Sequence, residues 1–196
     1  MRFLIHVAIM LLLTGCIPYS DNPLSDQSKE ALDDSIIGTW FWNEQDDYGF
    51  VHIGKDTDDK TLLITMIEFK NAGRIDTTEF KGHTSRLASH RFLNLKWTKP
   101  QDWNKGYIFI KYEVIADTLV FSSPDLSVLE KAVRSGALRG EIASSGDVLI
   151  HAGQNELRSY IVVNDKALFA NSSTLTRLTL PKPQGQVGSS AKPVDP

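Results

Sequence analysis

Apolar and polar residues alternate along several short stretches of the chain, which is the pattern of half-buried β-strands. In residues 91–98, Leu93, Leu95 and Trp97 share one face, because side chains two positions apart point the same way from a strand. Residues 107–114 alternate in the same way. The polar residues between these positions are expected on the opposite face of each strand.

Further short apolar stretches are bounded by turn-forming residues, so they are also predicted to be strands. With the two alternating stretches, the predicted strands are residues 36–43, 50–54, 61–70, 74–82, 91–98, 107–114, 119–121 and 147–151. Leu175, Leu178 and Leu180 are expected to close the sheet or pack across it. Short strands at regular spacing are typical of an antiparallel β-barrel or a strongly curved sheet.

The period changes to that of a helix in two places in the C-terminal half. Ser123 and Pro124 are suitable as an N-cap and a first helical residue, and Gly136 is a natural end. A second helix is predicted from Gln154 to about Asn164. The predicted fold class is therefore mainly β, with a barrel-like domain and two short helices.

The first residues form a different pattern, with Arg2 followed by an almost unbroken apolar run over residues 3–13. A run of this length is typical of a secretion signal, because a membrane-spanning helix needs about 20 apolar residues. The run ends in Leu13-Thr14-Gly15-Cys16, which resembles the lipobox of bacterial lipoproteins.

The lipobox resemblance implies that the chain is cleaved before Cys16 and that this cysteine carries acyl chains such as palmitate. Each buried methylene contributes about 0.8 kcal/mol, so two or three chains anchor a protein durably. In Gram-negative lipoproteins, an aspartate after the cysteine marks retention at the inner membrane. This chain has Ile17 there, so the resemblance implies the outer membrane, facing the periplasm, in a Gram-negative host.

We therefore expect four parts: a signal peptide over 1–15, a lipidated N-terminus and tether over 16–35, a β-barrel-like domain over 36–180, and a disordered tail over 181–196. The tether contains Pro18, Pro23 and several Ser and Asp residues, with a short helix expected at about residues 26–32. The tail is rich in Pro, Gly and Ser. The central part has the size of one domain.

The charge and cysteine content of the chain exclude some classes of partner and crosslink. The chain has 21 basic and 24 acidic residues, and no basic run stands out. Nucleic acids and anionic lipid headgroups are therefore not expected as partners. Cys16 is the only cysteine, so no disulfide is expected within the monomer.

Gly38 and Trp40, at the start of the first predicted strand, resemble the Gly-x-Trp entry motif of the lipocalin superfamily. There, the tryptophan closes one end of an eight-stranded barrel and the glycine lets the backbone pass close by. Avidin-like barrels also begin with Gly-x-Trp. The second lipocalin signature, Thr-Asp-Tyr before a late strand, has no good counterpart in this chain.

A barrel of this kind would hold an apolar ligand among aromatic side chains. Trp42, Phe69 and Tyr112 are the candidate lining residues, and Trp103, in a polar loop, is a candidate contact for a ligand or a protein partner. The alternative for such aromatic residues is ordinary core packing.

Candidate chemistry is sparse elsewhere in the chain. Asp56 and Asp58 do not fit a calcium loop, because the positions that need Gly and Glu hold other residues. The histidines lack metal-binding spacing, and no nucleophile elbow or phosphate loop occurs. No metal, cofactor or catalytic residue is therefore predicted, although Glu68, Glu79 and Glu113 would serve a hydrolase if two of them met in one cleft.

Three functions remain open from the sequence. The first is a lipid-tethered barrel that binds a small apolar or amphiphilic molecule without catalysing a reaction. The second is a filled barrel that acts through its surface as an accessory subunit of an envelope complex. The third is a hydrolase. The size of the inward-facing side chains distinguishes the first two, because a binding cup needs free volume.

Overall fold

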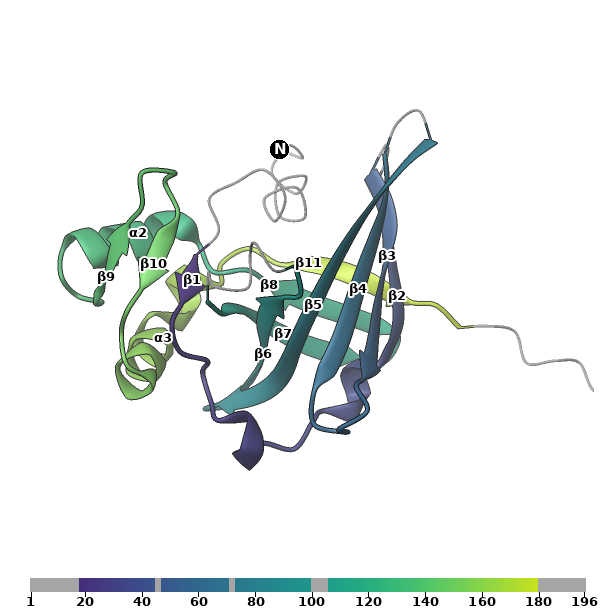
Figure 1. The fold of residues 1–196 in the computed structure, drawn as a ribbon, viewed down its shortest axis with the longest axis horizontal. Helices are drawn as coiled ribbons and strands as arrows, with labels where there is room; N and C mark the ends of the chain where they lie inside the picture. Colours follow the sequence, from purple (N-terminus) through teal and green to yellow (C-terminus); the bar gives the residue numbers. More distant parts are fainter. Residues whose placement is uncertain (1–17, 45–46, 71–72, 100–105, 180–196) are drawn as a thin grey trace, which may run out of the picture.

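The computed structural model describes residues 18–44, 47–70, 73–99 and 106–179. Within them, eight antiparallel strands close into a barrel in the order β11-β2-β3-β4-β5-β6-β7-β8 (Figure 1). The barrel strands are β2 (Gly38–Glu44), β3 (Asp47–Lys55), β4 (Leu62–Lys70), β5 (Arg74–Leu87), β6 (His90–Trp97), β7 (Ile108–Ile115), β8 (Thr118–Ser122) and β11 (Ser173–Arg177). Two helices, α2 (Leu126–Arg134) and α3 (Gln154–Leu168), lie in the C-terminal half. The predicted mainly β barrel with two helices is confirmed.

Alternation along each strand decides which side chains fill the barrel. In β4, Leu62, Ile64 and Met66 are buried, whereas Leu63 between them is exposed. The strands β2 to β8 follow one another as neighbours in space, so each is joined to the next by an antiparallel connection. Even-numbered residues of β4 therefore face the interior, and odd-numbered residues face outward.

The barrel has two distinct ends. At one end, which we call the closed end, β2 begins and β7 finishes, and Ile36 and Trp40 lie there. We call the opposite end, where β2, β4 and β6 finish and β3, β5 and β7 begin, the mouth. Figure 1 shows that β3, β4 and β5 rise together toward one extremity of the molecule, and this is their mouth end.

A second structural unit separates β8 from β11, the last barrel strand. It contains α2, β9 (Gly140–Ile142), β10 (Val148–Ile150) and α3. Their apolar faces pack on the outer wall of the barrel, where Phe92 contacts Phe169 with ring centroids 5.6 Å apart. The first helix is capped by Asp125, whose carboxylate accepts from the amides of Ser127 and Val128, rather than by Ser123 as we expected.

The strand predicted over residues 147–151 is present as β10, but it does not enter the barrel. It forms a separate three-stranded sheet with β9 and with β1 (Tyr19–Ser20) from the start of the described chain. Its pairing partner therefore lies some 130 positions earlier in the sequence, and local pattern does not reveal such a partner.

Residues 18–35, which we expected to form a tether, pack against the barrel. Leu24 is fully buried, and its amide donates to the side-chain oxygen of Asn94 at 2.6 Å. Two 3-10 turns, η2 (Gln27–Lys29) and η3 (Asp34–Ile36), follow along this segment. This segment contains few large apolar residues, and Leu24 is one that becomes buried against the barrel wall.

Candidate functional site

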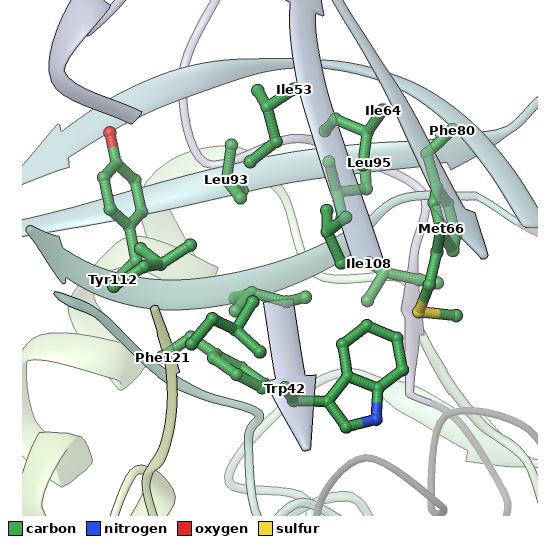
Figure 2. Close-up of a pocket in the computed structure, with 14 residues that line it drawn as sticks. Trp42, Ile53, Ile64, Met66, Phe80, Leu93, Leu95, Ile108, Tyr112 and Phe121 are labelled. Atoms are coloured by element: carbon green, nitrogen blue, oxygen red, sulfur yellow. The ribbon is translucent and has the colours of Figure 1, made fainter. Parts of the chain in front are cut away.

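A cavity of about 80 Å³ occupies the interior of the barrel. Every strand of the barrel contributes to its wall, because each presents its inward-facing positions there. The lining residues are Trp42, Val51, Ile53, Ile64, Met66, Phe80, Leu93, Leu95, Ile108, Ile110, Tyr112, Leu119, Phe121 and Leu175. Figure 2 shows Trp42 and Tyr112 on opposite sides of this space, with aliphatic side chains between them. The surface that these side chains present to the cavity is apolar, so the space suits an apolar group.

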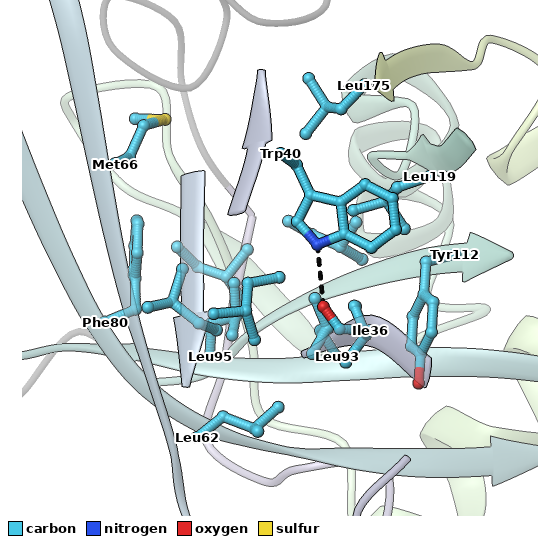
Figure 3. Packing of buried hydrophobic residues seen from close by; sticks show 14 of the residues in the cluster. Ile36, Trp40, Leu62, Met66, Phe80, Leu93, Leu95, Tyr112, Leu119 and Leu175 are labelled. Atoms are coloured by element: carbon cyan, nitrogen blue, oxygen red, sulfur yellow. Dashed lines mark hydrogen bonds between the residues drawn. The ribbon is translucent and has the colours of Figure 1, made fainter. Parts of the chain in front are cut away.

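Trp40 seals the closed end. Its indole Nε1 donates to the carbonyl oxygen of Ile36 at 2.8 Å, and its side chain is fully buried (Figure 3). The Arg177 guanidinium carbon lies 4.0 Å from the centroid of the Trp40 ring, which is cation–π geometry. The same guanidinium donates to the carbonyl oxygens of Ser35 and Ile37, at 2.6 and 2.7 Å. One arginine thus fastens the tryptophan and the η3 turn together.

The glycine of the Gly-x-Trp motif has a local role at this end. Gly38 has φ of +143°, and a Cβ atom there would lie 2.6 Å from Nη1 of Arg177. A side chain would therefore displace the guanidinium from Trp40.

Trp42 lies on the mouth side of the cavity and is almost fully buried. It pairs in register with Gly49 of β3, and its indole lies close to that glycine: a Cβ atom on Gly49 would be 2.5 Å from the ring. Next to Gly49 in register is Glu68, whose buried carboxylate lies 3.1 Å from the Lys70 ammonium. The mouth thus carries a packed tryptophan beside an ion pair.

Tyr112 connects the cavity to a polar cluster at the closed end. Its hydroxyl donates to Asp33 at 2.9 Å, and Asp33 also accepts from Arg91 and from the amide of Ser35. Burial, followed by the neighbouring Asp33 carboxylate, raises the pKa of Tyr112. Although burial opposes it, the hydrogen bonds from Ser35 and Tyr112 hold the pKa of Asp33 below its ordinary value. Tyr112 therefore stays a neutral donor with a structural role.

The predicted lining residues are placed differently by the structure. Trp42 and Tyr112 line the cavity. Phe69 does not, because position 69 of β4 faces outward, and its ring stacks on that of Tyr48 with centroids 5.1 Å apart. The inward position beside it is taken by Glu68. Cys16 and Trp103 lie outside the described residues.

Most of the wall was not singled out from the sequence. The aliphatic residues of β4, β6 and β7 carry the alternating signal, but that signal does not separate an open cup from a filled one. Arg177 was missed altogether, because an isolated arginine in the last strand has no local pattern that points to a tryptophan some 137 positions earlier.

The three strand glutamates that a hydrolase would use do not meet in one cleft. Glu68 is buried inside the mouth, whereas Glu79 and Glu113 are on the outer surface. The histidines are also dispersed, and in the described ranges no group of three or more His, Cys, Asp or Glu side chains is placed to hold a metal ion.

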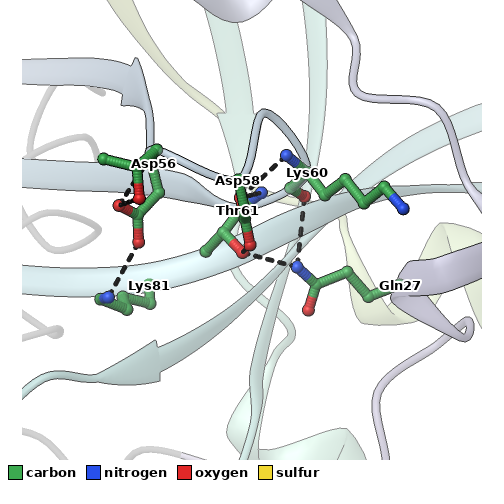
Figure 4. A network of polar contacts seen from close by, with 7 residues as sticks. Gln27, Asp56, Asp58, Lys60, Thr61 and Lys81 are labelled. Carbon is green, nitrogen blue, oxygen red and sulfur yellow. Dashed lines mark hydrogen bonds and ion pairs between the residues drawn. The ribbon is translucent and has the colours of Figure 1, made fainter.

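Asp56 and Asp58, in the turn between β3 and β4, have their carboxylates hydrogen-bonded or paired with nearby groups of the same chain. Asp58 accepts from the amides of Lys60 and Thr61 and from the Thr61 hydroxyl, at 2.7–2.9 Å (Figure 4). Asp56 pairs with Lys81 at 2.9 Å. Gln27 from η2 reaches the same turn by donating to the Thr61 hydroxyl at 2.7 Å. These carboxylates thus shape a hairpin turn.

A second hollow, of about 590 Å³, lies on the outer surface beside β6, β7 and β8. It is larger than the interior cavity, and charged side chains line it. Lys111 is paired with Asp165 at 2.7 Å, and Arg91 is paired with Asp33. Because these two cations already have carboxylate partners, they attract an anionic ligand to the hollow less strongly than unpaired cations would.

No helix in the described residues is long and apolar enough to cross a membrane. A scan against protein-family models, a search of curated proteins and a search of solved structures each found no match for this chain.

Proposed function

We propose that this protein is a lipid-anchored protein of the bacterial cell envelope whose barrel takes up the end of one slender apolar chain. The observation that carries this proposal is the interior cavity, which is closed at one end by Trp40 and walled by apolar side chains. Burial of apolar surface would drive uptake, at about 25 cal/mol per Å² removed from water.

The volume of the cavity limits the ligand. An apolar cavity of about 150 Å³ is large enough for benzene, and pockets for drug-sized molecules measure about 300–1,000 Å³. At about 80 Å³, this cavity accommodates a short alkyl segment and excludes ring systems. A longer chain requires Trp42 to turn away from Gly49, since the indole lies at the mouth side of the space.

The small volume also favours a second candidate function, in which the filled barrel is an accessory subunit that acts through its surface. Large side chains such as Phe80, Leu95 and Phe121 occupy most of the interior. In that case the cavity is a packing defect, and the Gly-x-Trp and arginine arrangement serves stability alone.

A binding measurement with matched variants separates the two functions. The probe is cis-parinaric acid, a slender fluorescent fatty acid, titrated into the protein and then displaced with dodecanoate. Ile110→Phe fills the cavity, whereas Ile115→Phe makes the same change at an exposed position of the same strand. Uptake predicts that Ile110→Phe weakens binding at least tenfold, about 1.4 kcal/mol, and that Ile115→Phe binds like the unaltered protein.

A second variant gives a clear result even if the unaltered protein does not bind the probe. Met66→Ala removes a lining side chain and enlarges the space, so it is expected to bind the probe more tightly. If neither the unaltered protein nor Met66→Ala binds, uptake is refuted and the surface function is favoured. Crosslinking in the host envelope is then the experiment for finding the partner.

The anchor is tested separately by metabolic labelling with an alkyne palmitate in a bacterial host. The full chain is expected to incorporate the label, and Cys16→Ser is expected to lose it while remaining detectable by immunoblot. An unlabelled full chain would remove the lipoprotein proposal and leave the cavity to be tested by itself. In a Gram-negative host, we expect the labelled protein in the outer-membrane fraction.

A further inference from the structure

The N-terminal segment crosses the outside of the barrel from the mouth to the closed end. At the mouth, Ser20 exchanges two backbone hydrogen bonds with Tyr107, just before β7 begins, at 2.8 and 2.7 Å. Further along, Leu24 is held by Asn94 in the middle of β6. The segment ends at the closed end, where Ile36 accepts from Trp40. The described chain therefore starts at the mouth.

This starting point determines where an acylated Cys16 can lie. Cys16 is three positions before Tyr19, and an extended chain spans at most about 3.3–3.6 Å per residue. The Cα atom of the residue that carries the acyl chains is consequently within roughly 11 Å of the Cα atom of Tyr19. Granted the lipid anchor of the proposed function, on which this inference rests, the bilayer surface passes close to the mouth.

An exposed apolar patch lies at the same end of the barrel. Tyr48, Phe69 and Ile75, which we call the rim patch, are directly opposite one another on β3, β4 and β5. Tyr48 is 47% exposed and Ile75 is 59% exposed. The Tyr48 and Phe69 rings are stacked with an interplanar angle of 7°, and Phe50 meets Phe69 edge-on at 5.9 Å. Three adjacent strands thus present one continuous apolar surface.

The two cations at the end of the β4–β5 hairpin have carboxylate neighbours. Lys70 lies 3.1 Å from Glu68, and Arg74 lies 3.6 Å from Asp76. Neither cation therefore brings an uncompensated positive charge to the rim patch. Aromatic side chains with a polar end, such as that of Tyr48, are enriched at the level of lipid headgroups.

We propose that the rim patch rests in the headgroup layer of the bilayer, so that the mouth of the barrel faces the membrane that carries the anchor. The anchor supplies the attachment, and the rim patch fixes the orientation by burying its apolar surface about 5–10 Å deep, as interfacial segments do. In this orientation the apolar cavity opens toward the lipid, and the closed end with Trp40 points away from it.

The test uses the full lipidated protein in vesicles of phosphatidylethanolamine and phosphatidylcholine, which carry no net charge. Because the single natural cysteine is acylated, an introduced cysteine is the one free thiol that an NBD fluorophore can label. Ile75→Cys reports the rim patch, and Tyr48→Cys reports it a second time. Ile115→Cys is the matched control, because Ile115 is an isoleucine of similar exposure, 55%, at the closed end.

We expect both rim labels to show blue-shifted emission and strong quenching by lipids brominated near the headgroup, and the Ile115→Cys label to show neither. Equal quenching at the two ends of a protein that floats with the vesicles would overturn the orientation and leave the anchor standing. A protein that fails to float would overturn the anchor and the orientation together. If the rim labels are quenched and the Ile115→Cys label is not, but the protein does not bind cis-parinaric acid, only the proposed uptake of an apolar chain is overturned.

Discussion

Asn94 holds the N-terminal segment onto the barrel, and replacing it is the sharpest test of how that segment is fastened. The side chain is fully buried on the outer face of β6. Its oxygen accepts from the Leu24 amide at 2.6 Å, and its nitrogen donates to the Ser85 hydroxyl at 2.6 Å and to the His83 carbonyl oxygen at 3.4 Å. Asn94→Leu keeps the site filled but removes all three bonds.

The three lost bonds do not cost the same, and the bond to His83 is the longest of them. The Ser85 hydroxyl keeps a partner in the Ser25 hydroxyl. The Leu24 amide has no replacement in the variant, and a buried donor without a partner costs about 1–3 kcal/mol. We therefore expect Asn94→Leu to lower the free energy of unfolding by about 2 kcal/mol, which corresponds to roughly 4–8 °C in the melting temperature for a chain of this length.

Thermal and urea unfolding followed by circular dichroism measure this loss, and limited proteolysis reports whether residues 20–36 detach first. Asn171→Leu, at an exposed position, is the matched control and is expected to change stability by less than about 0.5 kcal/mol. The reasoning is refuted if Asn94→Leu is as stable as this control and its N-terminal segment resists the protease as well as that of the unaltered protein.

Three further changes test other parts of the fold. Gly49→Ala would place a Cβ atom against the Ile67 carbonyl oxygen and 2.5 Å from the Trp42 ring, so we expect a loss of about 1–3 kcal/mol from the two contacts together and altered tryptophan fluorescence from the second; unchanged emission would contradict the packing of Trp42. Burial lowers the pKa of His83, whose ring contacts the Ser25 carbonyl, so the unfolded chain binds a proton more readily and stability falls as the pH drops below about 6.5. His83→Gln should reduce the difference between urea midpoints at about pH 7.5 and about pH 5.5, and an equal difference would exclude His83 as its source. Arg177→Met removes a cation–π contact and two hydrogen bonds, so we expect a loss of about 2 kcal/mol in urea unfolding; a stability like that of the unaltered protein would show that the arginine does not fasten the closed end.

The barrel itself was predictable because its signal is local. Alternation in residues 91–98 and 107–114 reflects the two faces of a strand, and the strands β6 and β7 lie there. The same reasoning places Asn94 on the face opposite Leu93 and Leu95, and the structure shows that this outer position is buried as well. The covering comes from residues 18–35 and from the unit between β8 and β11, and neither is visible in the strand's own pattern.

The candidate site was predictable only in part for a related reason. Trp42 and Tyr112 were correctly expected inside the barrel, whereas Phe69 was assigned to the wrong face. The residues 61–70 are apolar on both faces of the strand, so the pattern there does not decide which positions point inward. The decision comes from pairing with β3, which places Glu68 beside Gly49 on the inner side.

The position of β11 has a consequence for how the chain matures. Because residues 123–172 separate β8 from the strand that completes the ring, the first seven barrel strands emerge from the ribosome well before their last partner. At about 5–20 residues per second, this gap lasts roughly 3–10 s during synthesis. Throughout it, β2 and β8 present unpaired edges, which are the templates on which strands of other chains aggregate. If the chain is secreted as proposed above, it must remain extended, or be held by a chaperone, until its final strand has crossed the membrane.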